Sequence, residues 1–334
     1  MENTIDNGGM TTPNNIPVMP EKKMKRTRQR LIFYILIMLF PLAHFALFKA
    51  YLNFDMVAMA LSKYVRPEGQ DAYVRQFVWF ENFEKVIEMM GSTSTFGHKY
   101  ILMLRNSMLF YGIGLTFVPV GIFYAYYIYK GYPLGNVFRV ILYLPQIVSS
   151  VVLCFLYREM MRTVVQVGGL EMGHIVLYNF WTGFGTNVIM YTGAMCGINS
   201  SISESAQLDG ASSFRELWSI TIPMVFPTIV TFLVMGIAGI FTLQANLYSF
   251  YGAQLYGQNE KAVAFQPIGY YMYVNSVYSS PTGVLKGNEG MMLIGYGPMT
   301  FPELSALGLM ITAVVLPTAL VTRHLLEKYG PSDK

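Results

Sequence analysis

Six long apolar runs set the main pattern of the sequence. They cover residues 31–48, 107–129, 140–157, 175–198, 220–250 and 304–322. Each run is close to or longer than the roughly 20 residues that a helix needs to cross the hydrocarbon core of a bilayer. Inside lipid every backbone N–H and C=O must be paired within its own segment, so these runs are expected to be helical. The pattern therefore predicts an all-α integral membrane protein with six transmembrane helices.

Basic residues predict the orientation of these helices. A cluster of Lys and Arg between residues 22 and 30 directly precedes the first run, and such clusters are typical of the cytoplasmic side. Six crossings return the chain to the cytoplasm, where Arg323 and Lys328 follow the last run. We therefore expect a multi-pass protein of the cell membrane, plasma or inner, with cytoplasmic N- and C-termini.

The stretches between the runs complete the expected organisation. It comprises a partly disordered cytoplasmic tail at 1–30, a first transmembrane helix at 31–52, an extracellular loop at 53–100, a transmembrane core at 101–325 and a cytoplasmic tail at 326–334. The core holds a polar cytoplasmic loop at 199–222 and an extracellular insertion at 251–302. Its Gly-rich part at 279–301 lacks periodicity, and loops of this length are usually functional or disordered. We expect it to dock or gate on the outer face.

Composition excludes several other classes of protein. Hydrophobic residues make up 53% of the 334-residue chain and charged residues 13%, about half the roughly 25% of a soluble domain. Cys154 and Cys196 both lie in apolar runs, which excludes a disulfide scaffold. The four histidines are scattered, so neither a metal site nor a catalytic site is expected. The basic cluster adjoins a span, which favours membrane topology over a nucleic-acid partner.

The cytoplasmic loop at 199–222 is the polar feature that predicts chemistry. Ser201 with Glu204 and Ser213 with Glu216 have the spacing of capping boxes. Gly210 between them suits a sharp turn. We therefore predict two short helices around an Asp209-Gly210 turn. In the second helix, an apolar stripe is expected from the helical spacing of Phe214, Leu217, Trp218 and Thr221. Acidic residues predominate in the loop, which favours docking to a cytoplasmic partner over binding to anionic lipid.

The residues of this loop resemble a known motif. Glu204-Ser205-Ala206-x-x-Asp209-Gly210-Ala211, followed by Ile220-Thr221-Ile222-Pro223 and Pro227, is similar to the cytoplasmic EAA loop of binding-protein-dependent ABC importer permeases. The closest likeness is to the maltose and multiple-sugar permease branch. Ser205 replaces the usual alanine, and Leu217 replaces the usual phenylalanine.

Further segments resemble the same family, in the same order along the chain. They are Phe77 to Phe83, Arg105-Asn106-Ser107, Phe138 to Pro145, and Trp181-x-x-Phe184-Gly185-x-Asn187. Together the likeness covers roughly residues 77–278.

The resemblance implies the ABC-importer permease (type I) fold with a cytoplasmic coupling helix. It implies a chain that is not an enzyme and binds no cofactor. ATP and Mg²⁺ would sit on two cytoplasmic ATPase subunits. A second permease, expected to be a different chain, would complete the pore, and an extracellular solute-binding protein would deliver the solute. By position, the ATPase-coupling residues would be Glu204, Ser205, Ala206, Asp209, Gly210, Ala211 and Leu217.

Polar residues within the spans are the candidates for a substrate path, because polar groups in a membrane are costly unless they are used. They are Gln146, Ser149, Asn187, Tyr191, Gln244 and Asn246. None is charged, which favours an oligosaccharide or a similar neutral polyhydroxylated solute. Each of them has an alternative role in holding helices together. Gly193-x-x-x-Gly197 predicts close helix packing, and we expect no transport role for it.

A stand-alone secondary transporter or channel for a neutral solute is the alternative function. Such proteins usually carry charged relays within their spans. The six runs contain none.

Overall fold

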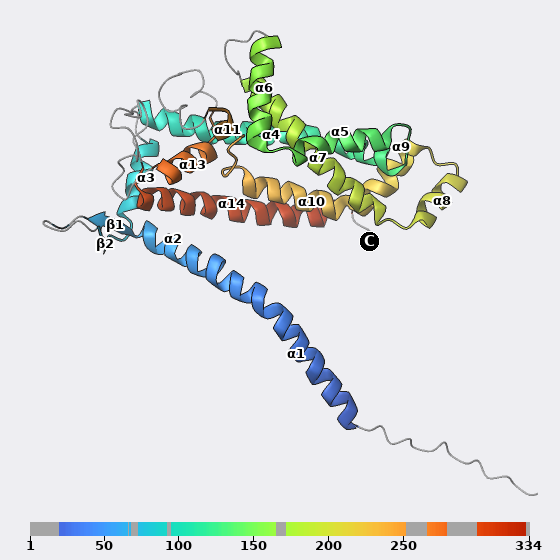
Figure 1. Ribbon diagram of the computed structural model, residues 1–334, viewed down its shortest axis with the longest axis horizontal. Helices are drawn as coiled ribbons and strands as arrows, with labels where there is room; N and C mark the ends of the chain where they lie inside the picture. Colours follow the sequence, from blue (N-terminus) through green and yellow to red (C-terminus); the bar gives the residue numbers. More distant parts are fainter. Residues whose placement is uncertain are drawn as a thin grey trace, which may run out of the picture. The chain divides into compact units, whose positions relative to one another are not determined.

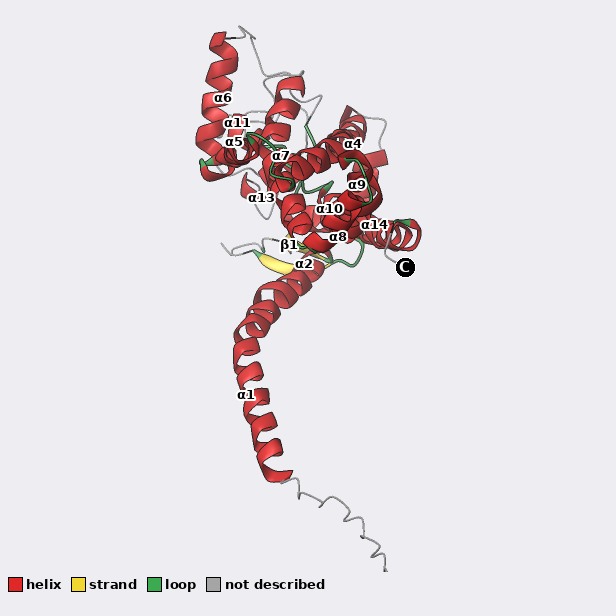
Figure 2. Ribbon diagram, turned by 90° about the vertical axis from the view of Figure 1, so that its right-hand side faces the viewer, coloured by secondary structure: helices red, strands yellow, loops and turns green. Residues whose placement is uncertain are grey.

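The computed structural model describes residues 20–65, 67, 73–91, 95–164, 172–251, 266–278 and 299–331. These residues are mostly helical, with one short antiparallel pair of strands (Figures 1 and 2). The chain falls into two compact units, Met1–Met56 and Val57–Lys334. The tail at 1–19 and the Gly-rich insertion at 279–298 lie outside the described residues.

The first unit is a helix without a packed face. α1 (Pro20–Phe45) continues through a π-helical stretch, η1 (Ala46–Tyr51), into α2 (Leu52–Ala60). The stretch Gln29–Ala60 is long and apolar enough to cross a membrane, and none of its most apolar part is buried within the chain. Bare apolar side chains of this kind need lipid or another protein around them. The first expected span is therefore helical, and its helix extends beyond residue 52.

The expected outer loop at 53–100 is more ordered than the sequence predicted. β1 (Ser62–Val65) pairs with β2 (Val74–Phe77), with Ser62 opposite Phe77. α3 (Glu81–Gly91) follows. The buried amide of Asn82 in α3 donates to the carbonyls of Ala60 and Ser62, at 2.7 and 2.8 Å. This side chain therefore ties α3 to the strand pair.

Long helices build the second unit. They are α4 (Thr95–Tyr129), α5 (Gly135–Ile147), α6 (Ser150–Val164), α7 (Met172–Cys196), α10 (Ile222–Gly239) and α14 (Phe301–Tyr329), with the shorter α11 (Leu247–Tyr251) and α13 (Ile268–Tyr278). α7 packs against α4 and α5, and α10 runs beside α14 (Figure 1). α4 has 35 residues, or about 50 Å at 1.5 Å per residue, so it is longer than a bilayer core.

The helical fold is confirmed, but the number of apolar spans differs from six. Among the described residues, four stretches pass as membrane-crossing helices: Gln29–Ala60, Tyr100–Tyr129, Ser213–Gly239 and Phe301–Tyr329. A bent pair, α5 with α6, makes a fifth. The run expected at 175–198 is the 25-residue α7. α7 is outside that set because polar residues such as Asn179 and Asn187 interrupt it.

The third expected run, 140–157, is not one continuous helix. α5 and α6 meet at an angle of 105°. Val148, which ends α5, is extended, with φ −81° and ψ 142°. Ser149 and Ser150 follow, and serine favours a helix start over a helix interior. The apolar pattern alone does not reveal this break.

The fifth expected run, 220–250, is also interrupted. α10 ends at Gly239, and α11 begins at Leu247. Between them Ala245 and Asn246 have φ values of 50° and 55°, in the left-handed region that ends a right-handed helix. Non-helical backbone at membrane depth is tolerated where it lies inside protein or lines a cavity.

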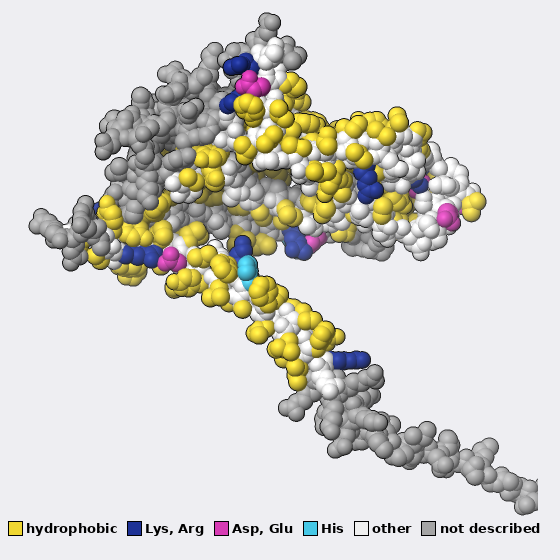
Figure 3. Space-filling view, viewed as in Figure 1, with side chains coloured by type: hydrophobic (Ala, Val, Ile, Leu, Met, Phe, Trp, Pro, Cys, Tyr) yellow, Lys and Arg dark blue, Asp and Glu magenta, His cyan; other side chains and the backbone are white. Residues whose placement is uncertain are grey.

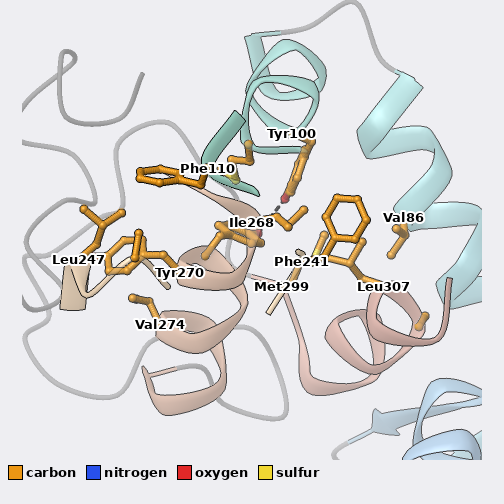
Figure 4. Packing of buried hydrophobic residues seen from close by; sticks show 14 of the residues in the cluster. Val86, Tyr100, Phe110, Phe241, Leu247, Ile268, Tyr270, Val274, Met299 and Leu307 are labelled. Carbon is orange, nitrogen blue, oxygen red and sulfur yellow. Dashed lines mark hydrogen bonds between the residues drawn. The ribbon is translucent and has the colours of Figure 1, made fainter. Parts of the chain in front are cut away.

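One hydrophobic cluster joins α3, α4, α13 and α14 (Figure 4). The Tyr100 and Tyr271 hydroxyls lie 2.7 Å apart at its centre. The Ser107 hydroxyl accepts from the backbone N–H of Ile268 at the start of α13. The expected insertion at 251–302 therefore contains a buried helix. Tyr270 and Tyr271, which lie in this expected insertion, are core residues.

Candidate functional site: the coupling loop and the central cavity

The loop at 199–222 folds as two short helices around a turn (Figure 2). α8 (Ser200–Leu208) is capped at its C-terminus by Asp209, and Gly210 follows with φ +76°. Glycine adopts this conformation without steric cost. α9 (Ser213–Glu216) begins after the turn. The prediction of two helices around Asp209-Gly210 is confirmed.

Both predicted capping boxes are wrong. The Asn199 side chain accepts from the N–H of Ser201, at 3.1 Å, and caps α8. The Ser212 hydroxyl accepts from the N–H of Arg215, at 3.3 Å, and caps α9. Asn and Ser are comparable caps, so Ser-x-x-Glu spacing does not decide between neighbouring polar residues.

The predicted coupling residues divide into a surface set and a buried set. Glu204, Ser205, Asp209 and Gly210 are exposed, and Ala211 is half-buried. Ala206 is 8% exposed and Leu217 is 2% exposed. Ser205, Ala206, Asp209 and Ala211 line a groove of about 500 Å³ between the two helices. A docking segment can reach that groove, whereas the Leu217 side chain packs in the core.

The predicted apolar stripe is split between the core and the surface. α9 continues as a π-helical turn, η2 (Leu217–Thr221), whose wider winding departs from the 3.6-residue period. Leu217 and Thr221 consequently point inward. Phe214 and Trp218 are exposed, with their rings stacked 6.4 Å apart.

Leu208 is a surface residue of this loop that sequence reasoning missed. It lies beside the Asp209-Gly210 turn and is 88% exposed. Acidic side chains are visible at the same end of the molecule, by α8 (Figure 3). Leu208 therefore places an exposed apolar side chain beside Asp209, next to the groove that the predicted coupling residues line. Leu208 occupies one of the two unspecified positions between Ala206 and Asp209 in the motif, and its apolar side chain there was the available signal.

A cavity of about 710 Å³ lies between α4, α5, α6, α7 and the break before α11. Four of the predicted path residues line it, namely Gln146, Asn187, Tyr191 and Asn246. Ser149 does not line it, although the neighbouring Ser150 does. Gln244 lines a second cavity of about 680 Å³, which shares Asn179, Leu243 and Asn246 with the first.

Asn179 is the polar wall residue that sequence reasoning missed. Its amide nitrogen donates to the carbonyl of Ala245 at 2.9 Å. Its amide oxygen accepts from the Asn246 side chain at 2.8 Å. Asn179 therefore holds both left-handed residues of the break against α7. An isolated Asn in an apolar run gave no signal of this partner, which is 67 residues away.

The chemistry of the cavity is polar and uncharged. Its lining includes Thr182, Thr186 and four amide side chains, and none of its described lining residues is Asp, Glu, Lys, Arg or His. The rings of Phe117 and Phe180 also line it, with centroids 3.8 Å apart and ring planes tilted by 30°. Amides can exchange hydrogen bonds with hydroxyl groups, and aromatic faces suit flat apolar surfaces. Among the described residues no group of His, Cys, Asp or Glu is arranged to hold a metal ion.

An apolar helical bundle, an uncharged cavity and an exposed helical loop at one end define a membrane transport component. The chain belongs to the family described as binding-protein-dependent transport system inner membrane component, whose sequence model matches residues 117–325.

Proteins with a similar sequence include transport permeases of Bacillus subtilis. The polygalacturonan/rhamnogalacturonan transport permease YteP is 24% identical over 222 residues, which are 58% of this chain and 68% of YteP. The arabinooligosaccharides transport permease AraP is 22% identical over 237 residues, 63% of this chain and 66% of AraP.

A solved structure has the same fold. A chain of a bacterial ABC transporter that imports the acidic polysaccharide alginate superposes with a TM-score of 0.62 at 20% identity. The match covers 92% of this chain and 99% of that chain. The importer permease fold is therefore confirmed. The individual coupling and path residues stay predictions.

Proposed function

We propose that this chain is the non-catalytic permease subunit of an ATP-driven importer for a neutral oligosaccharide. It forms the translocation path with a second permease, a different chain. Two cytoplasmic ATPases, which bind ATP and Mg²⁺, dock on α8 and the turn after it. An extracellular solute-binding protein delivers the sugar. The chain itself binds no cofactor, and its termini and coupling loop lie in the cytoplasm.

One observation carries this proposal. The exposed loop of α8 and α9 is continuous with α7, whose side chains form a wall of the uncharged cavity. A displacement of the loop by a partner therefore acts on the helix that contacts the transported solute. The exposed loop suits docking, and the uncharged cavity suits a path for solute.

The uncharged lining supports the neutral class of substrate. Among the relatives, AraP is named for neutral arabinooligosaccharides and YteP for acidic polygalacturonan and rhamnogalacturonan. An acidic sugar brought into a low-dielectric cavity needs a cation to pair with its carboxylates. The described lining has none, so neutral sugars fit best.

Reconstitution in vesicles tests the proposal. The full complex with its binding protein is offered lactose, maltopentaose, arabinopentaose and trigalacturonate, and uptake is followed with ATP inside. We expect ATP-dependent uptake of at least one neutral saccharide and none of trigalacturonate. Uptake by the chain alone without ATP would instead establish the stand-alone transporter.

Substitutions in the loop test the docking surface. Gly210→Pro cannot adopt φ +76°, because proline is locked near −65°. Glu204→Lys reverses an exposed charge on α8. We expect each to lower ATP-driven uptake at least tenfold, with normal membrane insertion. Glu327→Lys, at an exposed position on α14, is the matched control and keeps uptake within twofold. Wild-type uptake in both loop variants would refute docking at α8.

A further inference from the structure

A buried triangle of polar groups lies beneath the coupling loop. The ammonium group of Lys130, directly after α4, is 2.5 Å from a carboxylate oxygen of Glu216 in α9. The hydroxyl of Ser203 in α8 accepts from Lys130 and donates to Glu216, both at 2.7 Å. Three side chains thus join α4, α8 and α9.

The surroundings of this triangle hold it in place. The Lys130 ammonium lies 5.7 and 5.8 Å from the ring centroids of Tyr126 and Tyr129, within cation–π range. From the same turn, the Tyr132 hydroxyl donates to the hydroxyl of Ser213, at 2.9 Å. Side chains of the turn after α4 therefore make one polar contact with α8 and two with α9.

Burial distinguishes this ion pair from the others. The Lys130 and Glu216 side chains are 13% and 4% exposed. In every other described ion pair, both side chains are at least about a third exposed. Well-packed apolar residues often stabilise a fold as well as a buried ion pair does. A gain in stability is therefore a weak explanation for the presence of this buried pair. The fixed geometry that the pair imposes on the loop is a better one.

We propose that Lys130, Ser203 and Glu216 are positioning residues that clamp the coupling loop to α4. A displacement of α8 by a partner then moves α4 together with α7. α4 also lines the cavity, through residues such as Phe110 and Phe117. The clamp thus adds a side-chain connection from α8 to α4 beside the covalent connection of α8 to α7 through the turn at 197–199. This inference rests on the proposed ATP-driven transport.

The experiment measures uptake per ATP hydrolysed in the reconstituted complex, with the neutral saccharide from the panel above that the wild type takes up. The test variant is Lys130→Met with Glu216→Met, which removes both charges together and leaves neither one unpaired. We expect the ratio to fall at least tenfold while the ATPases still copurify. The control is Arg323→Met with Glu327→Met, an exposed pair on α14, and its ratio stays within twofold of wild type.

Ser203→Ala gives a second arm that changes no charge. It removes both hydrogen bonds of the Ser203 hydroxyl, and we expect at least a threefold fall in the same ratio. If the double variant does not assemble, the uptake-to-ATP ratio of Ser203→Ala alone tests the clamp. A ratio within twofold of wild type in assembled Ser203→Ala and double variants overturns the clamp. A wild-type complex without ATP-dependent uptake refutes the proposed function instead.

Discussion

At the scale of single residues, Asn179 determines the shape of the cavity wall. Its amide serves both strained residues of the break, by donating to the Ala245 carbonyl and accepting from Asn246. A buried polar group that loses its partner costs about 1–3 kcal/mol. Left-handed backbone at non-glycine residues adds strain that the surrounding structure must hold.

The first prediction follows from that contact. Asn179→Leu should lower the stability of the purified complex by about 2–4 kcal/mol, because two partners lose hydrogen bonds at once. Thermal unfolding in detergent measures the change. Asn187→Leu, which alters an exposed amide on the same cavity wall, should leave the melting temperature unchanged and weaken uptake. Equal melting temperatures for the wild type and Asn179→Leu would contradict this role.

Residue roles were predictable where local conformation decides them. The Asp209-Gly210 turn was predictable, because a left-handed turn needs glycine whatever lies around it. The buried ion pair of Glu216 was not predictable, because its partner Lys130 is 86 residues away in sequence. Leu217 was assigned to a docking surface from its motif position, and a π-helical turn brings it into the core.

At the scale of elements, the close approach of α5 to α7 depends on Gly185 rather than on the predicted pair, Gly193 and Gly197. Gly193 has open space where a side chain would stand, and Gly197 meets only a carbonyl of its own helix. At Gly185 in α7, a methyl group would collide with the carbonyl oxygen of Leu142 in α5. The packing of α5 on α7 therefore requires glycine at residue 185.

Gly185→Ala should therefore destabilise the complex, by about 1–3 kcal/mol as for other overpacked sites. Gly183→Ala is the matched control. It lies two residues earlier on α7 with nothing within 4 Å of an added methyl group, and alanine there favours the helix. Thermal unfolding of the two variants side by side gives the comparison. A Gly185→Ala variant as stable as Gly183→Ala would show that α5 shifts freely.

The long helices were predictable because lipid demands apolar residues over their whole length. The breaks at Val148 and at Ala245-Asn246 were not predictable, because a straight helix and an interrupted one can have the same apolar sequence pattern. The pair of β1 and β2 also escaped prediction. Those strands have only four residues each and alternate too briefly to be distinguished from a loop.

At the scale of the whole second unit, the structure connects the exposed loop of α8 and α9 to a cavity. α8 and α9 join α7 covalently and α4 through Lys130. α4 and α7 form two walls of the cavity. Both breaks in the apolar runs lie at that cavity, as expected for irregular backbone at membrane depth. A force on the loop would therefore act directly on two walls of the cavity that we propose as the solute path.

The central claim is that a cytoplasmic ATPase holds the tip of this loop. Leu208 is 88% exposed there, and a photo-crosslinking side chain at that position reports its neighbour directly. In the working complex in native membranes, we expect a crosslink to the ATPase subunit, with Leu316 on the exposed face of α14 as a control that gives none. A probe at residue 208 that crosslinks no ATPase, or that an impermeant reagent reaches from outside the cell, would contradict the account.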